Sequence, residues 1–255
     1  MRPKVRMDTI SRTTIIDSLP DFEGGTAVLL DKAVRKSSFD LVYKVRKASG
    51  VKKAGHAGTL DPMATGLVIV CTGRMTKEIF RFQGMDKTYT GIITLGRTTP
   101  SYDAETEFNS LNNFDNVNEN EIFRTRDLFI GKMMQVPPMY SAIKRNGQAL
   151  YKFARKGVEF ERQPREVTLS RFEITKVELP DIHFEIDCSK GTYIRVIAND
   201  FGRELGCGAY LKALRRTRIG DFKVEDAFLI DEFREIINKY SAVCSDELTE
   251  EVITV

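Results

Sequence analysis

The sequence has little of what would place the protein in a membrane, in a disulfide-stabilised fold or around a structural metal. Its longest clean apolar run, residues 67–71, is far shorter than the ~20 residues that a spanning helix needs. No apolar stretch follows the basic N-terminus, which excludes a secretory signal. Four cysteines form no CxxC pair and only two histidines accompany them, which argues against a zinc site. We therefore expect reduced thiols, a cytoplasmic location, no bound metal and no membrane association.

The signatures of several common enzyme classes are missing as well. There is no Walker A motif, no dinucleotide-binding GxGxxG, no GxSxG elbow and no HExxH helix. With these excluded, the candidates for chemistry are carboxylates and aromatic side chains.

What the chain has is length, a core-forming composition and unevenly distributed charge. Its 255 residues, 42% of them hydrophobic, suffice for one large domain or a domain with a small appendage. Residues 142–170 carry seven Lys or Arg against three Glu, whereas residues 231–255 carry seven acids against two bases. This alternation indicates a face for polyanions, although charge runs are equally typical of ordinary solvated surfaces.

Strands and helices are mixed without a regular βαβ rhythm, which favours an α+β fold. We predict strands at residues 26–30, 67–71, 87–95 and 182–188 and helices at 76–82, 119–130, 148–156 and 192–205. Ser37 and Ser38 predict the start of a further helix that ends at Gly50, with Phe39, Leu41, Val42 and Val45 inward. Residues 54–66 are predicted to form a loop.

That loop contains the most informative stretch, GHAGTLDPMATG at residues 55–66. Its three glycines permit a tight path, and Pro62 biases Asp61 away from helical backbone. A carboxylate on a rigid loop beside a buried strand could serve as a nucleophile or a base. The competing interpretation is an Asx turn, in which Asp61 only binds its own backbone.

The loop closely resembles the catalytic motif of the TruB family, the bacterial tRNA pseudouridine-55 synthases, whose essential aspartate corresponds to Asp61. Four further segments match other motifs of the family, in the order in which those motifs follow one another along the chain. These segments are DKTY with LGRTT (86–89 and 95–99), QVPPMYSAIK (135–144), CSKGTYIR (188–195) and LRR (214–216). The family's early motif Lys-Pro-x-Gly-x-Ser/Thr-Ser appears here as KAVRKSS (32–38), without its proline and glycine, which puts local geometry in doubt.

The resemblance implies a role for each matched residue. Asp61 would be the catalytic nucleophile or base, with Arg195 as the neighbouring cation that keeps it ionised. Substrate-binding residues would be Tyr89 and Tyr193, which stack on a flipped base, with Leu214 as an apolar wall and His56 in the space that the nucleotide leaves. Lys144, Arg145, Lys152 and Arg155 would bind the RNA backbone.

The resemblance also implies the pseudouridine synthase fold, a long mixed, mainly antiparallel sheet flanked by helices with a central active-site cleft. We expect an N-terminal extension (1–25), a catalytic domain (26–230) with an RNA-binding insertion at about 142–165, and an acidic C-terminal helix or tail (231–255) without a PUA-type domain. The implied substrate is uridine 55 in the T-loop of tRNA, isomerised without a cofactor. We expect a monomer with no obligatory protein partner. An RNA-binding module without chemistry and a guide-RNA-dependent relative are the alternatives.

Overall fold

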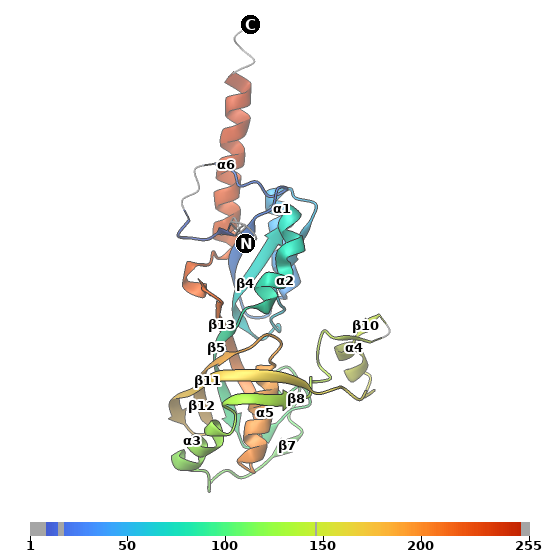
Figure 1. Ribbon diagram of the computed structural model, residues 1–255, viewed down its shortest axis with the longest axis vertical. Helices are drawn as coiled ribbons and strands as arrows, with labels where there is room; N and C mark the ends of the chain where they lie inside the picture. The colour runs from blue at the N-terminus through green and yellow to red at the C-terminus, as the bar shows by residue number, and fades with distance from the viewer. Residues whose placement is uncertain (1–8, 15–17, 146, 251–255) are drawn as a thin grey trace, which may run out of the picture. The chain divides into compact units, whose positions relative to one another are not determined.

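The structure, a computed structural model, describes residues 9–14, 18–145 and 147–250. The chain forms two compact units, one from Met1–Met85 with Arg216–Val255 and the other from Asp86–Arg215. The boundary at Arg215 and Arg216 falls inside a single strand, β13 (Ala209–Ile219). Each unit has its own sheet pairings and helices, many of which are labelled in Figure 1.

The first unit is built around β4 (Thr65–Thr72), whose residues from Gly66 onward are all buried. A strand covered on both faces reads as a continuous apolar run, which is why this segment does not alternate. β4 pairs antiparallel with β2 (Ala27–Lys32) and with β3 (Ala54–His56), and β2 pairs in parallel with β1 (Thr9–Ile10). The end of β13 pairs with β14 (Phe222–Lys223). The helical elements of this unit are α1 (Ser38–Ser49), η1 (Gly73–Glu78), α2 (Ile79–Gly84), η2 (Val224–Asp226) and α6 (Ile230–Glu250).

Helix α1 begins and ends where the sequence predicts, but one predicted core residue is wrong. Ser37 and Asp40 form a reciprocal capping box, and Gly50 closes the helix at φ 69°. Its buried face consists of Ser38, Leu41, Val42 and Val45. Phe39 is instead 63% exposed, because it lies off the stripe that faces β3 and β4.

The second unit has antiparallel strands in the order β5 (Lys87–Leu95), β12 (Asp181–Cys188), β11 (Arg165–Glu178) and β8 (Gly131–Gln135). Two short ribbons, β6 (Arg97–Thr98) with β7 (Ser110–Leu111) and β9 (Lys144–Arg145) with β10 (Gln148–Ala149), are also antiparallel. Its helices are α3 (Glu119–Asp127), α4 (Leu150–Ala154) and α5 (Ile194–Glu204). Phe129, Phe172 and Phe201 pack against one another with ring centroids about 6 Å apart and join α5 to the sheet.

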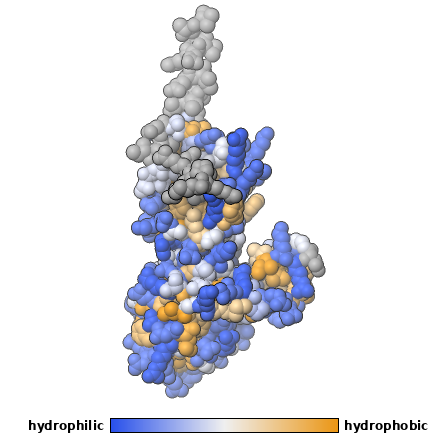
Figure 2. Space-filling model, viewed as in Figure 1, coloured by the Kyte–Doolittle hydropathy of each residue, from blue (hydrophilic) through white to orange (hydrophobic). Residues whose placement is uncertain are grey.

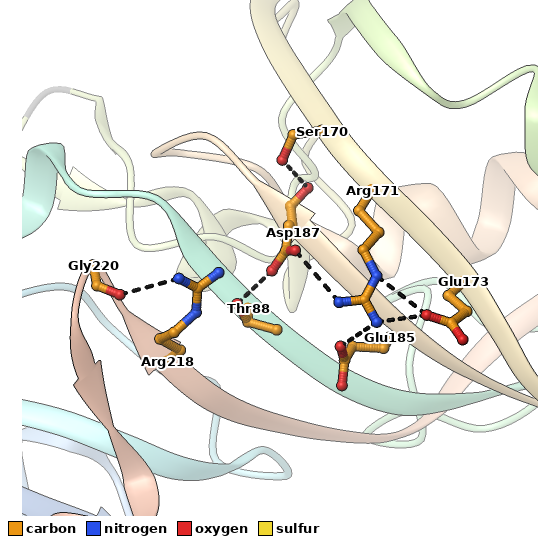
Figure 3. A network of polar contacts seen from close by, with 8 residues as sticks. All are labelled: Thr88, Ser170, Arg171, Glu173, Glu185, Asp187, Arg218 and Gly220. Carbon is orange, nitrogen blue, oxygen red and sulfur yellow. Dashed lines mark hydrogen bonds and ion pairs between the residues drawn. The ribbon is translucent and has the colours of Figure 1, made fainter.

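A network of polar side chains connects three neighbouring strands of this unit (Figure 3). The Arg171 guanidinium lies 2.5 Å from Glu173 and 2.6 Å from Glu185, and its hydrogen bond to Glu173 raises the pKa of Arg171. Asp187 lies 3.7 Å from Arg171 and accepts a hydrogen bond from the Thr88 hydroxyl. Ion pairs with exposed partners contribute about 0–1 kcal/mol each, so the network adds modestly to the pairing of β5, β12 and β11.

The α+β class is confirmed, and β5 has the predicted bounds. The prediction missed β11 and β13, the two longest strands, and β3, which lies in the segment predicted as a loop. Both long strands carry many charged residues, with an interrupted burial pattern, so their apolar alternation is weak in sequence. In the described part of the chain, no helix has the length and apolar character needed to cross a membrane.

A glycine-to-alanine pair tests the contact that joins β4 to β13 in the first unit. Gly66 has φ 105°, and a Cβ there would lie 2.3 Å from the Arg216 carbonyl oxygen. Gly66→Ala is expected to lower the free energy of unfolding by about 3 kcal/mol or more, because both the backbone conformation and the space exclude a side chain. Gly84→Ala, at the end of α2 in open space, is the control and should be neutral or slightly stabilising. Equal urea midpoints for the two variants would contradict this packing.

Candidate active site

Asp61 lies in the first unit, on the loop between β3 and β4. Hydrogen bonds of the main chain hold this loop in place. The Ala57 amide donates to the Ile69 carbonyl at 2.9 Å, and the Ala64 amide closes a turn on the Asp61 carbonyl at 3.0 Å. The buried Ser38 hydroxyl at the start of α1 accepts a 2.9 Å hydrogen bond from the Leu60 amide. The turn at Asp61 is therefore closed by main-chain atoms.

A buried ammonium group connects this loop to the segment before α1. Lys32, fully buried at the end of β2, donates to the carbonyls of Lys36 at 2.7 Å, Ala33 at 3.2 Å and Pro62 at 3.4 Å. Pro62 follows Asp61 directly, and its carbonyl also accepts a 2.8 Å bond from the Arg35 amide. The residue next to Asp61 is therefore held by two donors from the segment that departs from the family's early motif.

A buried guanidinium group holds both ends of the same loop. Arg216 on β13 is 2% exposed, and its Nε donates to the Leu67 carbonyl at 2.7 Å while Nη2 donates to the Gly58 carbonyl at 3.2 Å. Gly58 precedes Asp61 and Leu67 follows it, so one side chain ties together the entry and exit of the loop. Charge-assisted bonds to carbonyls are about twice as strong as neutral ones.

His56, at the end of β3, is kept neutral by its surroundings. Burial lowers the pKa of His56, and the positive charge of Arg216 lowers it further, partly offset by a backbone hydrogen bond at Gly58. A neutral imidazole next to the loop can accept or donate a hydrogen bond without repelling a cation.

Arg195 lies in the second unit, on α5, and is 4% exposed. Its Nη1 lies 3.5 Å from Oδ2 of Asp103, whose side chain is fully buried. The other oxygen of Asp103 accepts from the Ser101 hydroxyl at 2.6 Å and from the Glu105 amide at 3.0 Å. These bonds orient the carboxylate, which in turn fixes the guanidinium. The resemblance identified Arg195 but not this carboxylate partner.

Tyr193, directly before α5, is held through its backbone by one buried amide. The Gln135 side chain accepts from the Tyr193 amide at 2.8 Å and donates to the Tyr193 carbonyl at 3.2 Å. The ring of Tyr193 lies 4.8 Å from the Arg165 guanidinium and 5.6 Å from that of Arg195, both within cation–π range. Gln135 thus links the proline-rich motif to the motif that carries Tyr193 and Arg195.

Tyr89 and Leu214, also in the second unit, lie on strands and are each 8% exposed. Tyr89 on β5 is paired with Ile186 of β12, next to the Thr88–Asp187 contact of Figure 3. Leu214 lies near the end of the part of β13 that belongs to this unit.

The predicted RNA-binding residues lie on the β9–β10 ribbon and α4 or beside them. Lys144, Arg145, Lys152 and Arg155 are all exposed. The Arg145 guanidinium lies 4.5 Å from the Phe160 ring and that of Arg155 5.5 Å from the Tyr151 ring. In Figure 2 this segment shows hydrophobic residues beside hydrophilic ones. Cations stacked on rings offer both charge and flat faces to a single strand.

The structure therefore distributes the predicted site over both units, with Asp61 and His56 in the first and Tyr89, Tyr193, Arg195 and Leu214 in the second. Sequence reasoning missed four supporting residues, Lys32, Asp103, Gln135 and Arg216, although all four lie in or beside the segments that resemble family motifs. Among the described residues, no cluster of His, Cys, Asp and Glu could hold a metal ion.

Two family models match nearly all of the chain beyond residue 45. They are the TruB family pseudouridylate synthase (N terminal domain), over residues 46–194, and the tRNA pseudouridylate synthase B C-terminal domain, over residues 195–254. The chain belongs to the TruB family of pseudouridylate synthases. Among its relatives is the tRNA pseudouridine synthase B of Flavobacterium johnsoniae, 47% identical over 218 residues that cover 83% of this chain and 95% of that protein. That of Chlorobium chlorochromatii is 47% identical over 233 residues, 88% of this chain and 91% of that protein.

Solved structures confirm the fold expected of a TruB family member. A chain of a Cbf5-Nop10-Gar1 complex matches with a TM-score of 0.66 and 25% identity over 89% of this chain and 62% of that one. The archaeal box H/ACA sRNP Nop10-Cbf5 complex matches with a TM-score of 0.64 and 23% identity over 86% of this chain. The match covers 56% of the matched chain of that complex.

Replacing Arg216 tests its hold on the Asp61 loop. Arg216→Met leaves the Leu67 and Gly58 carbonyls without their donor, so the free energy of unfolding should fall by about 2–4 kcal/mol. The pKa of His56 should rise towards its usual value, because a nearby positive charge is lost, while burial still holds it low. Imidazole proton shifts measured by NMR against pH follow this directly.

Arg218→Met is the matched control, because Arg218 lies on the same strand, is exposed, and donates to the Gly220 carbonyl at 3.4 Å (Figure 3). It should change neither the stability nor the His56 titration appreciably. A His56 pKa that is the same in Arg216→Met and in the parent would contradict the electrostatic coupling.

Proposed function

We propose that this protein isomerises uridine 55 in the T-loop of tRNA to pseudouridine, with Asp61 as the catalytic residue. The observation that carries this proposal is the Asp61 loop, fastened by Arg216 and Lys32 within a chain that matches the TruB family along most of its length. Relatives that are 47% identical over 83% and 88% of the chain are named tRNA pseudouridine synthase B.

The reaction breaks the N-glycosidic bond, turns the uracil and joins its C5 to the ribose, without redox change or phosphate transfer. Asp61 acts as a nucleophile toward the ribose or as a base at its 2′ carbon, and either role requires the carboxylate form. Arg195, which is oriented by Asp103, is the cation that favours ionisation of Asp61.

The remaining site residues bind the displaced base. Tyr89 and Tyr193 provide flat faces, and the bonds from Gln135 keep Tyr193 in place. A base–aromatic stack is worth about 1–3 kcal/mol, which offsets the few kcal/mol of unstacking that base extrusion costs. Leu214 forms the apolar wall, and the neutral His56 occupies the position that the flipped nucleotide leaves.

The proposal extends to the organisation of the chain. Residues 142–165 act as an RNA-binding insertion in a catalytic domain of residues 26–230, with residues 1–25 and 231–255 as extensions. The protein works in the cytoplasm as a monomer, without a cofactor or an obligatory protein partner. Support for tRNA as the substrate comes from the names of its relatives and from the exposed basic residues of the insertion.

Asp61→Asn separates chemistry from binding. The amide keeps the size of the side chain, and the turn at Asp61 is closed by the backbone, so the variant should fold and bind tRNA within a few-fold of the parent. Pseudouridine formation should fall by about 10³-fold or more, because the amide is neither a nucleophile nor a base at neutral pH. Tritium release from [5-³H]uridine-labelled tRNA measures this.

Asp221→Asn, in an exposed turn of the same unit, is the control and should retain full activity. Near-parental turnover by Asp61→Asn would overturn the assignment of Asp61. An inactive parent that binds tRNA would instead favour an RNA-binding module without chemistry.

The insertion is tested by its contribution to the salt dependence of binding. Lys144→Gln with Lys152→Gln removes two exposed charges and leaves the ring contacts of Arg145 and Arg155 intact. The slope of log K against log salt should fall by about 1.4–1.8, with a higher KM and little change in kcat. Lys176→Gln with Arg203→Gln, which removes two exposed charges elsewhere in the same unit, should leave the slope unchanged. Equal slopes for both double variants would show that the insertion is only a solvated face.

A further inference from the structure

Arg35 adopts a backbone conformation that its residue type disfavours. Its φ is 63°, in the left-handed region, and it is one of two residues other than glycine in the described chain with a positive φ. It lies where the resembled family motif has its glycine, the residue for which this conformation carries no steric penalty. The side chain is exposed, so core packing does not explain the choice of arginine.

The surrounding contacts hold Arg35 in this conformation. Its amide donates to the Pro62 carbonyl at 2.8 Å, and the flanking carbonyls of Ala33 and Lys36 both accept from the buried Lys32 ammonium. The segment therefore wraps around one cation and is tied to the residue next to Asp61. Strain that the surroundings over-determine in this way tends to occur at functional sites.

Two further features beside Arg35 are not explained by the packing of the fold. Lys36 and Arg35 place positive charge just before the N-terminus of α1, where the helix dipole favours negative charge. Phe39 and Tyr43, one helical turn apart on α1, are 63% and 60% exposed. Asp40, the acidic residue among them, is engaged in the capping box, where the Ser37 backbone amide lowers its pKa.

We propose that Arg35, Lys36, Phe39 and Tyr43 form a second RNA-contact surface, which binds the backbone and bases that flank the target nucleotide. This inference rests on the proposed function, because it needs RNA to be the ligand of the Asp61 loop. The segment is bonded to Pro62, the residue after Asp61, so it lies close to the point where a nucleotide would reach Asp61. Arginine and lysine bind those phosphates, and exposed rings beside them stack on unpaired bases.

Charge complementarity favours RNA over an apolar protein partner as the occupant. The exposed rings follow Arg35 and Lys36, two exposed cations just before the helix, whereas Asp40 is used for capping. The combination of cations and separated rings is that of a single-strand platform. We name these four residues, Arg35, Lys36, Phe39 and Tyr43, the α1 surface.

Arg35→Gly tests the α1 surface, because it should weaken tRNA binding without lowering the stability of the fold. Glycine accepts the left-handed conformation, so the thermal midpoint should stay the same or rise. The Kd for unmodified tRNA should increase by about fivefold or more, and the salt slope should fall by roughly 0.7–0.9 for one lost phosphate contact. Arg35→Lys should keep most of the affinity, since it retains the charge. Phe39→Gln should weaken binding with little change in salt slope.

Two controls lie in the same unit. Arg46→Gln removes one exposed charge from the far end of α1, and Phe80→Gln removes an exposed ring from α2, where Phe80 is 65% exposed. Both should bind tRNA within twofold of the parent. If Arg35→Gly binds like the parent while the parent forms pseudouridine, the α1 surface is wrong and the proposed function stands. If the parent neither binds tRNA nor forms pseudouridine, the proposed function itself fails.

Discussion

The Asp61 loop is held by two buried cations that bind its carbonyl oxygens, and the candidate site depends on this interaction. Arg216 joins the two ends of the loop, and Lys32 reaches the residue after Asp61. Burying a charge costs several kcal/mol unless polar groups replace the lost water. Here the carbonyl oxygens of the loop replace the lost water. The buried cations and the conformation of the loop therefore depend on each other.

The second unit uses neutral and negative groups for the same purpose. Gln135 holds the backbone of Tyr193 by both ends of its amide, and Asp103 faces the guanidinium of Arg195 while Ser101 and Glu105 orient it. Each unit therefore fixes its own share of the site by internal bonds. Within each unit these groups are held in place before any ligand binds, and preorganised groups of this kind lower a reaction barrier.

The sequence was most informative where local chemistry determines structure. Capping at Ser37, the stop at Gly50 and the bounds of β5 follow from short-range rules. The sequence did not predict β11 and β13, because charged, partly exposed strands acquire their structure from partners distant in sequence. The same limit applies to the site. The resemblance pointed to Asp61 and Arg195. It did not reveal Lys32 and Arg216, because they act through contacts with residues 30 and 158 positions away in the sequence. Asp103 was missed because nothing in the sequence around it indicates that its carboxylate is buried beside Arg195.

The altered segment before α1 has alanine and arginine where the resembled motif has proline and glycine, and its contacts stabilise the conformation of Arg35. A residue other than glycine in the left-handed region costs about 1–2 kcal/mol. Hydrogen bonds to a charged group contribute about 1.5–3 kcal/mol each, and Lys32 makes three to carbonyls around this segment. The Lys32 ammonium and the Pro62 carbonyl therefore outweigh the local preference of Arg35, and the loop path is set by these contacts. The glycine position is thereby free to carry a side chain, and here that side chain is a cation beside the Asp61 loop.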